Sequence, residues 1–323
     1  MAAAANIIIT GRNISSASGR GSSLSRRLVL SGIAAMAALL APGASAGGET
    51  APGRIVKDAV YRAVGGRPLH LDLYIHPAAR ERSGPVLVYF HGGGWARGAR
   101  PESWTGFRPY IAAGFSVVTV EYRLAGAARA PAAVEDARCA LHWIHTNAER
   151  YGFDRTRIVV SGTSAGAHLA LMAGLLPDEN AIDPAECRGA GRAAAIVDLY
   201  GPTDLTATKD ASGARHATVA NWIGEGDGAD AMAHRMSPVA WLRSDIPPIF
   251  IGHGDADPVV PVAQSIDLKR RLDALAVPAD LFIVPGGGHG KFDAGSQRAM
   301  TARVLAFLCG RRIPDPRACA EKN

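Results

Sequence analysis

The segment Ile158-Val159-Val160-Ser161-Gly162-Thr163-Ser164-Ala165-Gly166 joins a short apolar run to a serine between two glycines and then to an alanine-rich stretch. The apolar run predicts a buried strand, and the spacing of residues 165–176 predicts a helix. A G-x-S-x-G pattern between a strand and a helix predicts a sharp turn that presents the serine hydroxyl at the carboxyl edge of a sheet. Ser164 is therefore the candidate nucleophile. The plainer alternative is that Ser164 only caps the helix that follows it.

Further apolar runs surround this segment on both sides. They cover residues 86–90, 116–120, 194–200, 249–252 and 281–284. Unbroken apolar runs are typical of parallel strands that helices cover on both faces. Helical spacing between the runs, at residues 131–148, 262–275 and 297–308, supports that arrangement. The sequence therefore predicts an α/β fold with a mostly parallel, doubly wound sheet.

Two additions to this sheet are expected. Alternating segments at residues 55–62 and 69–75, on either side of Gly65-Gly66, predict an antiparallel hairpin at the N-terminal edge. Residues 201–246 form a long connection between two predicted strands and contain Trp222. Because connections of this length usually hold short helices or serve a function, we expect a small cap insertion over the site.

A glycine-rich loop, His91-Gly92-Gly93-Gly94-Trp95, follows the first predicted parallel strand. Acyl transfer places negative charge on the former carbonyl oxygen, and preorganised N–H groups stabilise that charge. We expect the backbone N–H groups of Gly93, Gly94 and Ala165 to form such an oxyanion hole, with His91 orienting the loop. The glycines lack the G-K-[ST] ending that a phosphate-binding loop requires.

A serine hydroxyl is a poor nucleophile until a base removes its proton, and the base needs a carboxylate to orient it. His289 follows the last predicted strand in a loop of glycines, and is the candidate base. Asp255 and Asp257 both follow the strand before it. We select Asp257 as the acid because Pro258 and two valines lock the turn behind it. Asp255 is expected to support the turn.

Aromatic residues and other histidines near these motifs are candidates for secondary roles. Trp95 and Trp222 are candidate substrate-binding residues in an aromatic or sugar-binding cleft, although tryptophan often serves packing alone. His168 and His253 are expected to flank the site without carrying chemistry. No metal site is predicted from Cys/His spacing, and no cofactor is expected.

The first 46 residues have the pattern of an export signal. They contain four arginines and no acidic residue, and the uncharged run at residues 28–41 precedes Ala44-Ser45-Ala46, which fits an A-x-A cleavage site. A run of this length is shorter than the ~20 residues that span a bilayer, so a stable membrane anchor is not expected. Arg26-Arg27 resembles a twin-arginine signal, with a Sec signal as the alternative. Cleavage would leave a single catalytic domain, residues 47–323, in the periplasm or outside the cell.

The composition of the chain bears on two questions, whether it binds nucleic acid and whether its cysteines form disulfides. The net charge of +6 falls to +2 without residues 1–46, with 31 basic against 29 acidic residues, so nucleic-acid binding is not expected. The hydrophobic fraction of 48% excludes a disordered or collagen-like chain. Cys309 and Cys319 are close enough in sequence to pair, which would leave Cys139 with Cys187. Four free thiols are the alternative, and the oligomeric state is not predicted.

With these motifs placed, the chain resembles the serine esterases of the α/β-hydrolase superfamily. His91-Gly92-Gly93-Gly94-Trp95, Tyr122-Arg123-Leu124 and residues 131–136 are similar to the hormone-sensitive-lipase-like branch, although Thr163 replaces the aspartate typical there. Residues 254–261 are more similar to bacterial feruloyl-esterase-like and acetyl-esterase-like hydrolases, and to prolyl-peptidase catalytic domains.

This resemblance implies a carboxylic-ester hydrolase with a Ser-His-Asp triad and an acyl-enzyme intermediate. The implied substrates are small-molecule or carbohydrate-linked esters with short acyl or aryl groups. Two alternatives remain open at this point. One is a serine peptidase of the prolyl-peptidase type, and the other is an inactive hydrolase-fold binding protein.

Overall fold

The computed structural model describes residues 53–208 and 216–320. The predicted export signal at residues 1–46 lies outside these described residues. Within them, the helices are all too short or too polar to cross a membrane.

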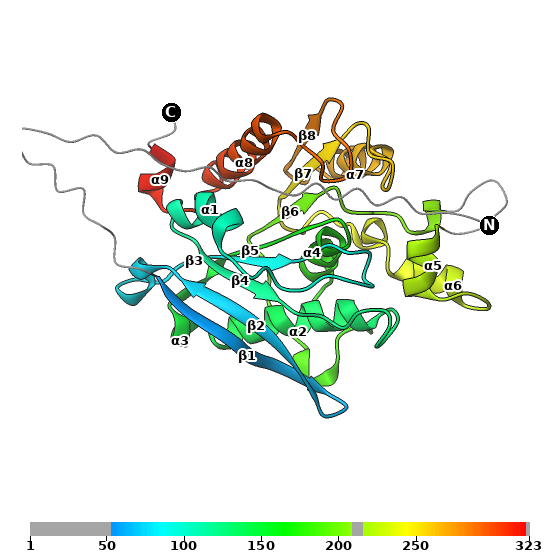
Figure 1. The fold of residues 1–323 in the computed structure, drawn as a ribbon, viewed down its shortest axis with the longest axis horizontal. Helices are drawn as coiled ribbons and strands as arrows, with labels where there is room; N and C mark the ends of the chain where they lie inside the picture. The colour runs from blue at the N-terminus through cyan, green and yellow to red at the C-terminus, as the bar shows by residue number, and fades with distance from the viewer. Residues whose placement is uncertain (1–52, 209–215, 321–323) are drawn as a thin grey trace, which may run out of the picture. The chain divides into compact units, whose positions relative to one another are not determined.

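One mixed sheet organises the described residues (Figure 1). Its strands are β1 (Arg54–Val64), β2 (Arg67–Ile75), β3 (Gly84–Phe90), β4 (Ser116–Val120), β5 (Phe153–Thr163), β6 (Ala195–Leu199), β7 (Ile249–Gly254) and β8 (Ala279–Val284). Their order across the sheet is β1-β2-β4-β3-β5-β6-β7-β8. The pairs β1–β2 and β2–β4 are antiparallel, and the strands from β4 to β8 are parallel. The predicted fold class, with its antiparallel N-terminal edge, is confirmed.

Helices cover both faces of the sheet. The helices are α1 (Arg108–Ala112), α2 (Ala132–Thr146), α3 (Ala148–Tyr151), α4 (Ala165–Leu175), α5 (Ala217–Ile223), α6 (Ala229–Arg235), α7 (Ala263–Ala274), α8 (Ala294–Cys309) and α9 (Pro316–Ala320). One apolar core lies between the sheet and α2, α4 and α7, and a second lies between the sheet and α1 and α8. In β5, Ile158 and Val160 belong to the first core and Val159 to the second. This alternation explains the unbroken apolar runs, since both faces of a covered strand are buried.

Two elements begin earlier than the sequence pattern predicts. β5 begins at Phe153 in a polar stretch, where Phe153 pairs with Gly84 of β3. α8 begins at Ala294 because Asp293 caps it: its Oδ1 accepts hydrogen bonds from the backbone N–H of Gly295, at 2.7 Å, and of Ser296, at 3.0 Å. At both starts, the sequence lacks the periodic spacing of apolar residues from which a strand or a helix is predicted.

The cap insertion, residues 201–246, holds its own short helices, as expected for a connection of this length. Its described part contains α5, α6 and the 3₁₀ turns η4 (Thr206–Thr208) and η5 (Pro238–Trp241). Trp222 and Ile223 of α5 pack into the same core as α4. Burial of these side chains attaches the cap insertion to the body of the domain.

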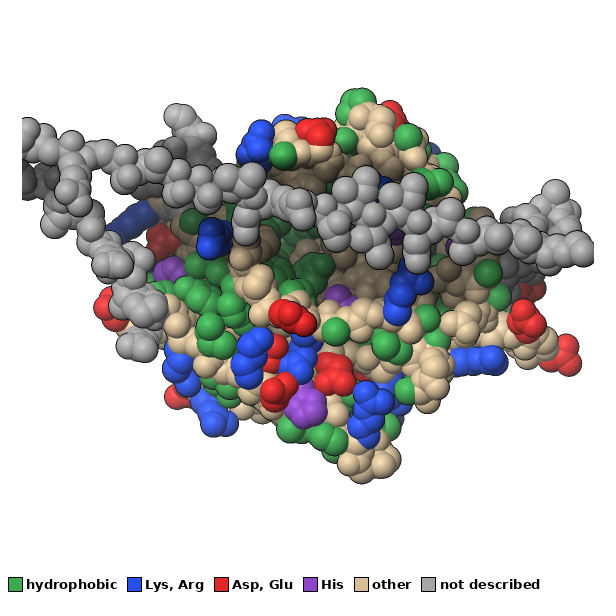
Figure 2. All heavy atoms as spheres, viewed as in Figure 1, with side chains coloured by type: hydrophobic (Ala, Val, Ile, Leu, Met, Phe, Trp, Pro, Cys, Tyr) green, Lys and Arg blue, Asp and Glu red, His purple; other side chains and the backbone are tan. Residues whose placement is uncertain are grey.

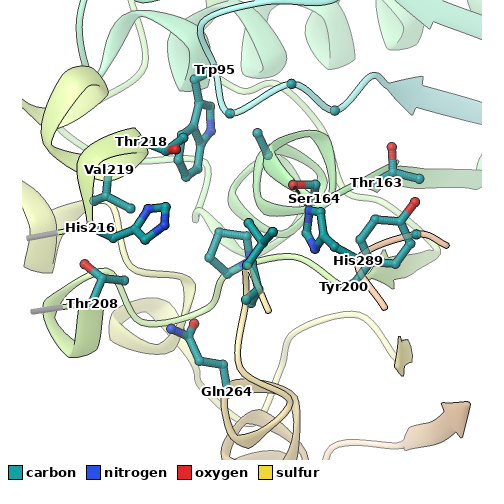
Figure 3. A pocket seen from close by; sticks show the side chains of 18 of the residues that line it. Trp95, Thr163, Ser164, Tyr200, Thr208, His216, Thr218, Val219, Gln264 and His289 are labelled. Atoms are coloured by element: carbon teal, nitrogen blue, oxygen red, sulfur yellow. Dashed lines mark hydrogen bonds between the residues drawn. The ribbon is translucent and has the colours of Figure 1, made fainter. Parts of the chain in front are cut away.

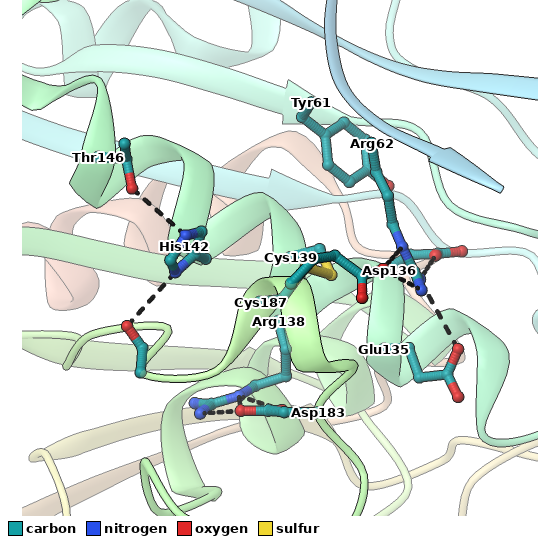
Figure 4. The surroundings of a disulfide bond; sticks show 12 residues. Tyr61, Arg62, Glu135, Asp136, Arg138, Cys139, His142, Thr146, Asp183 and Cys187 are labelled. Atoms are coloured by element: carbon teal, nitrogen blue, oxygen red, sulfur yellow. Dashed lines mark hydrogen bonds and ion pairs between the residues drawn. A yellow bond between two sulfur atoms is a disulfide. The ribbon is translucent and has the colours of Figure 1, made fainter.

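The four cysteines form two disulfides in the pairing that the sequence left open. Cys139–Cys187 joins α2 to the 3₁₀ turn η3 (Ala185–Cys187), and Cys309–Cys319 joins α8 to α9. Beside the first disulfide, Arg138 Nε donates to Asp183 Oδ1 at 2.9 Å and Arg138 Nη2 donates to Asp183 Oδ2 at 2.7 Å, with both side chains buried (Figure 4). A bidentate pair of this kind fixes geometry as well as contributing energy. The loop between α4 and β6 is therefore attached to α2 twice.

Opposite charges are paired over the N-terminal hairpin. Lys57 lies 2.9 Å from Asp72, and Arg100 lies 2.6 Å from Asp58. Figure 2 shows basic and acidic side chains intermingled over β1 and β2 on the visible face. This face is therefore of mixed sign, unlike the basic stripe that nucleic-acid binding requires.

Candidate active site

Ser164 lies in the tight turn between β5 and α4, with φ 54° and ψ −123°. This backbone conformation is uncommon for a residue with a side chain and stores strain. A Cβ atom on Gly162 would lie 2.3 Å from the backbone of Gly166, and one on Gly166 would lie 2.1 Å from the carbonyl oxygen of Phe90. Both glycines are therefore required for the turn. The Ser164 side chain makes no capping hydrogen bond, so the capping alternative does not describe its role.

Three loops bring Ser164, His289 and Asp257 into one hydrogen-bonded row. His289 Nε2 lies 2.7 Å from Ser164 Oγ, and His289 Nδ1 lies 2.7 Å from Asp257 Oδ2. These residues follow β5, β8 and β7, whose carboxyl ends meet at the same edge because the strands are parallel. A carboxylate only accepts, so Nδ1 carries the hydrogen and Nε2 is free to accept the serine proton. The arrangement can activate a serine hydroxyl.

The structure separates the two candidate aspartates by their contacts. Asp257 has a fully buried side chain, and its Oδ1 accepts from the N–H of Val259 at 2.7 Å and of Val260 at 2.9 Å. Asp255 is exposed, and its Oδ1 accepts from the N–H of Gly286 at 2.6 Å. Asp257 therefore orients His289, whereas Asp255 ties the loop after β7 to the loop after β8.

The glycine-rich loop after β3 lies beside Ser164 in a conformation that side chains would block. Gly93 and Gly94 have φ of 125° and 61°. A Cβ atom on Gly93 would lie 2.0 Å from the carbonyl oxygen of Arg97. Gly93, Gly94 and Ala165 line the same cavity as Ser164. The oxyanion hole formed by their backbone N–H groups stays a prediction.

His91 supports this loop from behind. Its Nδ1 lies 2.8 Å from the carbonyl oxygen of Gly92, and its ring stacks on Tyr122 with centroids 4.4 Å apart. The Tyr122 hydroxyl donates to the His91 carbonyl oxygen at 2.8 Å. Burial lowers the pKa of His91, which favours a neutral ring. The expected orienting role of His91 agrees with these contacts.

The prediction that Trp222 binds substrate is wrong. Its side chain is fully buried and stacks on Trp95, with centroids 4.4 Å apart and planes 9° from parallel. Trp95 reaches the cavity wall but is only 2% exposed. Its indole N–H donates to His168 Nδ1 at 3.3 Å, and His168 Nε2 donates to the Met236 carbonyl oxygen at 2.7 Å. The large apolar surfaces of both rings are used in packing, which joins the cap insertion to the glycine-rich loop.

A cavity of about 600 Å³ opens onto Ser164 (Figure 3). Much of its wall comes from residues that were not predicted to belong to the site, namely Thr208, His216, Thr218 and Val219 of the cap insertion and Pro258, Val259 and Gln264 before and within α7. No local motif marks these residues. The ring of Tyr200 packs edge-on against that of His289, with centroids 5.0 Å apart. Tyr200 is the last residue of the strand predicted at residues 194–200, and its place at the carboxyl end of that strand could have identified it.

Asp198, at the carboxyl end of β6, is a buried acid beneath this site. Its Oδ1 accepts from the N–H of Gly201 at 2.9 Å, and its Oδ2 has no hydrogen-bond partner among the described residues. Burial raises the pKa of Asp198 to about 7, because a charge there loses its hydration. The folded protein therefore retains a proton on Asp198 at pH values where the unfolded chain has lost it.

This retained proton predicts how stability changes with pH. The contribution of Asp198 to the free energy of unfolding should fall as pH rises from about 4 to about 7, by at most ~1.4 kcal/mol per pH unit. The asparagine of Asp198→Asn does not titrate. The free energy of unfolding of this variant, minus that of the wild type, should therefore increase as pH rises from about 4 to about 7. Urea denaturation at pH 5, 6, 7 and 8 measures the difference, with the exposed Asp273→Asn as control. Parallel stability curves for Asp198→Asn and wild type would contradict the prediction.

Comparisons with known proteins place these features in a family. The BD-FAE family model matches residues 71–272, which include Ser164 and Asp257. Esterase LipQ of Mycobacterium tuberculosis is 30% identical over 259 residues, covering 77% of this chain and 62% of the relative. Esterase LipC of the same organism is 28% identical, covering 74% and 61%. The match thus spans about three-fifths of the length of these mycobacterial relatives.

Solved structures agree with the family match. A truncated carbohydrate esterase from gut microbiota is 27% identical with a TM-score of 0.66, covering 81% of this chain and 98% of that one. The thermophilic esterase Est2 of Thermogutta terrifontis, solved with butyrate, is 25% identical with a TM-score of 0.66, covering 83% and 97%. From the matched family model, the α/β-hydrolase fold and the serine turn between β5 and α4, the chain belongs to the BD-FAE family.

Proposed function

We propose that the protein is a carboxylic-ester hydrolase that acts through an acyl-enzyme on Ser164. The observation that carries the proposal is the hydrogen-bonded row from Ser164 through His289 to Asp257 at the wall of an open cavity. A serine hydroxyl, a neutral imidazole and a buried carboxylate in this order are the parts that acyl transfer requires.

The proposed reaction has two halves. Ser164 Oγ bonds to the ester carbonyl carbon while His289 Nε2 accepts its proton, and the N–H groups of Gly93, Gly94 and Ala165 stabilise the resulting oxyanion. The C–O bond to the alcohol then breaks, and His289 returns the proton to the departing alcohol. Water next attacks the acyl group with His289 as base, which releases the acid and restores Ser164.

The cavity supports a proposal about the substrate class. Pro258 and Val259 provide an apolar wall for a short acyl or aryl group, and Thr218 and His216 provide polar groups on the cap side. A volume of about 600 Å³ is suited to a small ester with part of a larger alcohol. We therefore propose short-chain or aryl esters, including carbohydrate-linked esters, as substrates. Two structural relatives, a carbohydrate esterase and an esterase solved with butyrate, support this choice.

Covalent labelling and a substrate panel test this function. A fluorophosphonate probe is expected to label the folded protein on the peptide that contains Ser164, as read by mass spectrometry. Acetyl, butyryl, octanoyl and feruloyl esters should be hydrolysed with a preference for the shorter or aryl acyl groups. An aminoacyl p-nitroanilide should be cleaved more slowly than the matching ester. Faster amide cleavage would favour a peptidase, and a folded protein that never labels would favour a binding protein.

Export to the periplasm or beyond is proposed as well. The two disulfides support it, since disulfides persist in oxidising compartments. Expression of the full chain should yield a periplasmic or secreted protein whose N-terminus is Gly47, read by N-terminal sequencing. Replacement of Arg26 and Arg27 by lysine should block export by the twin-arginine route, and unchanged export would indicate a Sec signal.

A further inference from the structure

A second histidine touches the carboxylate that orients His289. His253, near the end of β7, has a fully buried side chain, and its Nε2 lies 3.2 Å from Asp257 Oδ2. We propose that His253 is a positioning residue that holds Asp257 in place for His289, through a polar contact with Asp257 Oδ2 and through its hydrogen bond to the Val260 carbonyl oxygen. The inference rests on the proposed function, because it assigns His253 a task in the same reaction.

The neighbours of His253 determine which ring nitrogen carries the hydrogen. Nε2 faces two groups that only accept, the Val260 carbonyl oxygen at 2.9 Å and Asp257 Oδ2. Nε2 must therefore carry the hydrogen. Nδ1 lies 2.6 Å from the hydroxyl of Ser265, in α7, and accepts its hydrogen. Burial lowers the pKa of His253, which keeps the ring neutral with Nε2–H directed at the acceptors.

These contacts complete the surroundings of Asp257. Oδ1 accepts from the backbone N–H groups of Val259 and Val260, and Oδ2 faces His289 Nδ1 and His253 Nε2. With donors on both oxygens, the carboxylate cannot rotate about its C–C bond without losing hydrogen bonds. The polar Nε2–H group of His253, 3.2 Å from Oδ2, also offsets part of the negative charge there, which reduces the attraction of Asp257 for a proton on His289.

A purely structural role for His253 makes a different prediction. The ring also links the turn at Val260 to α7 through Ser265, so any replacement will lower the free energy of unfolding. Stability alone cannot separate the two roles. A donor that shares the charge of Asp257 must in addition affect the pKa of His289, and this can be measured in the folded protein.

Two replacements separate the roles. His253→Phe keeps a planar ring but removes the N–H, whereas His253→Gln can keep one donor and one acceptor. His253→Phe is expected to lower kcat for a short p-nitrophenyl ester by about 10- to 100-fold, with KM changed less than about threefold. The acid limb of its kcat/KM profile should move to higher pH by about 0.5–1 unit, because the unshared carboxylate holds the imidazolium more tightly. His253→Gln should recover most of both effects.

A matched control is His145→Phe, since His145 is a half-buried histidine on α2 whose Nε2 lies 3.1 Å from the Arg192 carbonyl oxygen. It should leave the acid limb unmoved. An acid limb of His253→Phe that is unchanged or moves to lower pH would overturn the proposal, as would a His253→Gln variant no better than His253→Phe.

A readout independent of turnover separates this proposal from the proposed function. The downfield proton NMR signal of His289 Nδ1–H titrates with His289 and reports its pKa without substrate. Its midpoint should rise in His253→Phe and stay near wild type in His145→Phe. If the wild type hydrolyses no ester and yet the midpoint rises, the proposed function fails while the link between His253 and Asp257 holds. A midpoint that does not rise would overturn the positioning role.

Discussion

Ser164→Ala is expected to lower kcat for p-nitrophenyl butyrate by about 10⁴- to 10⁶-fold. The variant removes the Oγ that lies 2.7 Å from His289 Nε2, so no acyl-enzyme can form. Residual catalysis would come only from the N–H groups of the glycine-rich loop acting on attack by water. Steady-state rates with the uncatalysed background subtracted measure the loss.

The control for Ser164→Ala must exclude a folding defect. Alanine keeps a Cβ and therefore the same positive-φ strain, so the melting temperature and circular dichroism should match the wild type closely. Ser296→Ala, at the exposed start of α8, removes a hydroxyl outside the cavity wall and should keep its activity. Substantial ester hydrolysis by a pure, folded Ser164→Ala protein would overturn the assignment of the nucleophile.

Asp257→Asn is expected to lower kcat by about 10³- to 10⁴-fold at neutral pH. The backbone N–H groups of Val259 and Val260 both point at Oδ1, so the asparagine oxygen must take that position. Its NH₂ group then faces His289 Nδ1, which has to accept instead of donate. The hydrogen moves to Nε2, and His289 can no longer accept the Ser164 proton. The kcat of purified variant and wild type at pH 7–8 measures the loss.

Asp255→Asn is the matched control for this prediction. Asp255 lies two residues earlier in the same loop, is exposed, and contacts the N–H of Gly286 through Oδ1, which an asparagine oxygen can replace. The kcat of Asp255→Asn should stay within about threefold of the wild type. Replacing a charged acceptor by a neutral one weakens this exposed hydrogen bond only slightly. An Asp255→Asn variant as slow as Asp257→Asn would show that the two carboxylates have been assigned wrongly.

Much of the fold could be predicted because its signals are local. Strands buried on both faces, such as residues 86–90 and 158–161, have no polar alternation, and this distinguishes parallel strands from an exposed sheet. The turn at Ser164 was also predictable, since glycines at 162 and 166 are required for its backbone approach. The starts of β5 and α8 were missed because polar residues form them, through strand pairing and a cap.

By itself, the sequence determined the order of the strands and of the four long helices α2, α4, α7 and α8, the serine turn, the glycine-rich loop and the two loops that hold His289 and Asp257. Only the tertiary structure decided that Trp222 packs behind Trp95, that Tyr200 meets His289, and that His253 reaches Asp257. The physical reason is the distance along the sequence between the residues that interact. A turn or an apolar run depends on neighbours in sequence, whereas side-chain contacts between strands and the cap insertion depend on register and packing that no local pattern records.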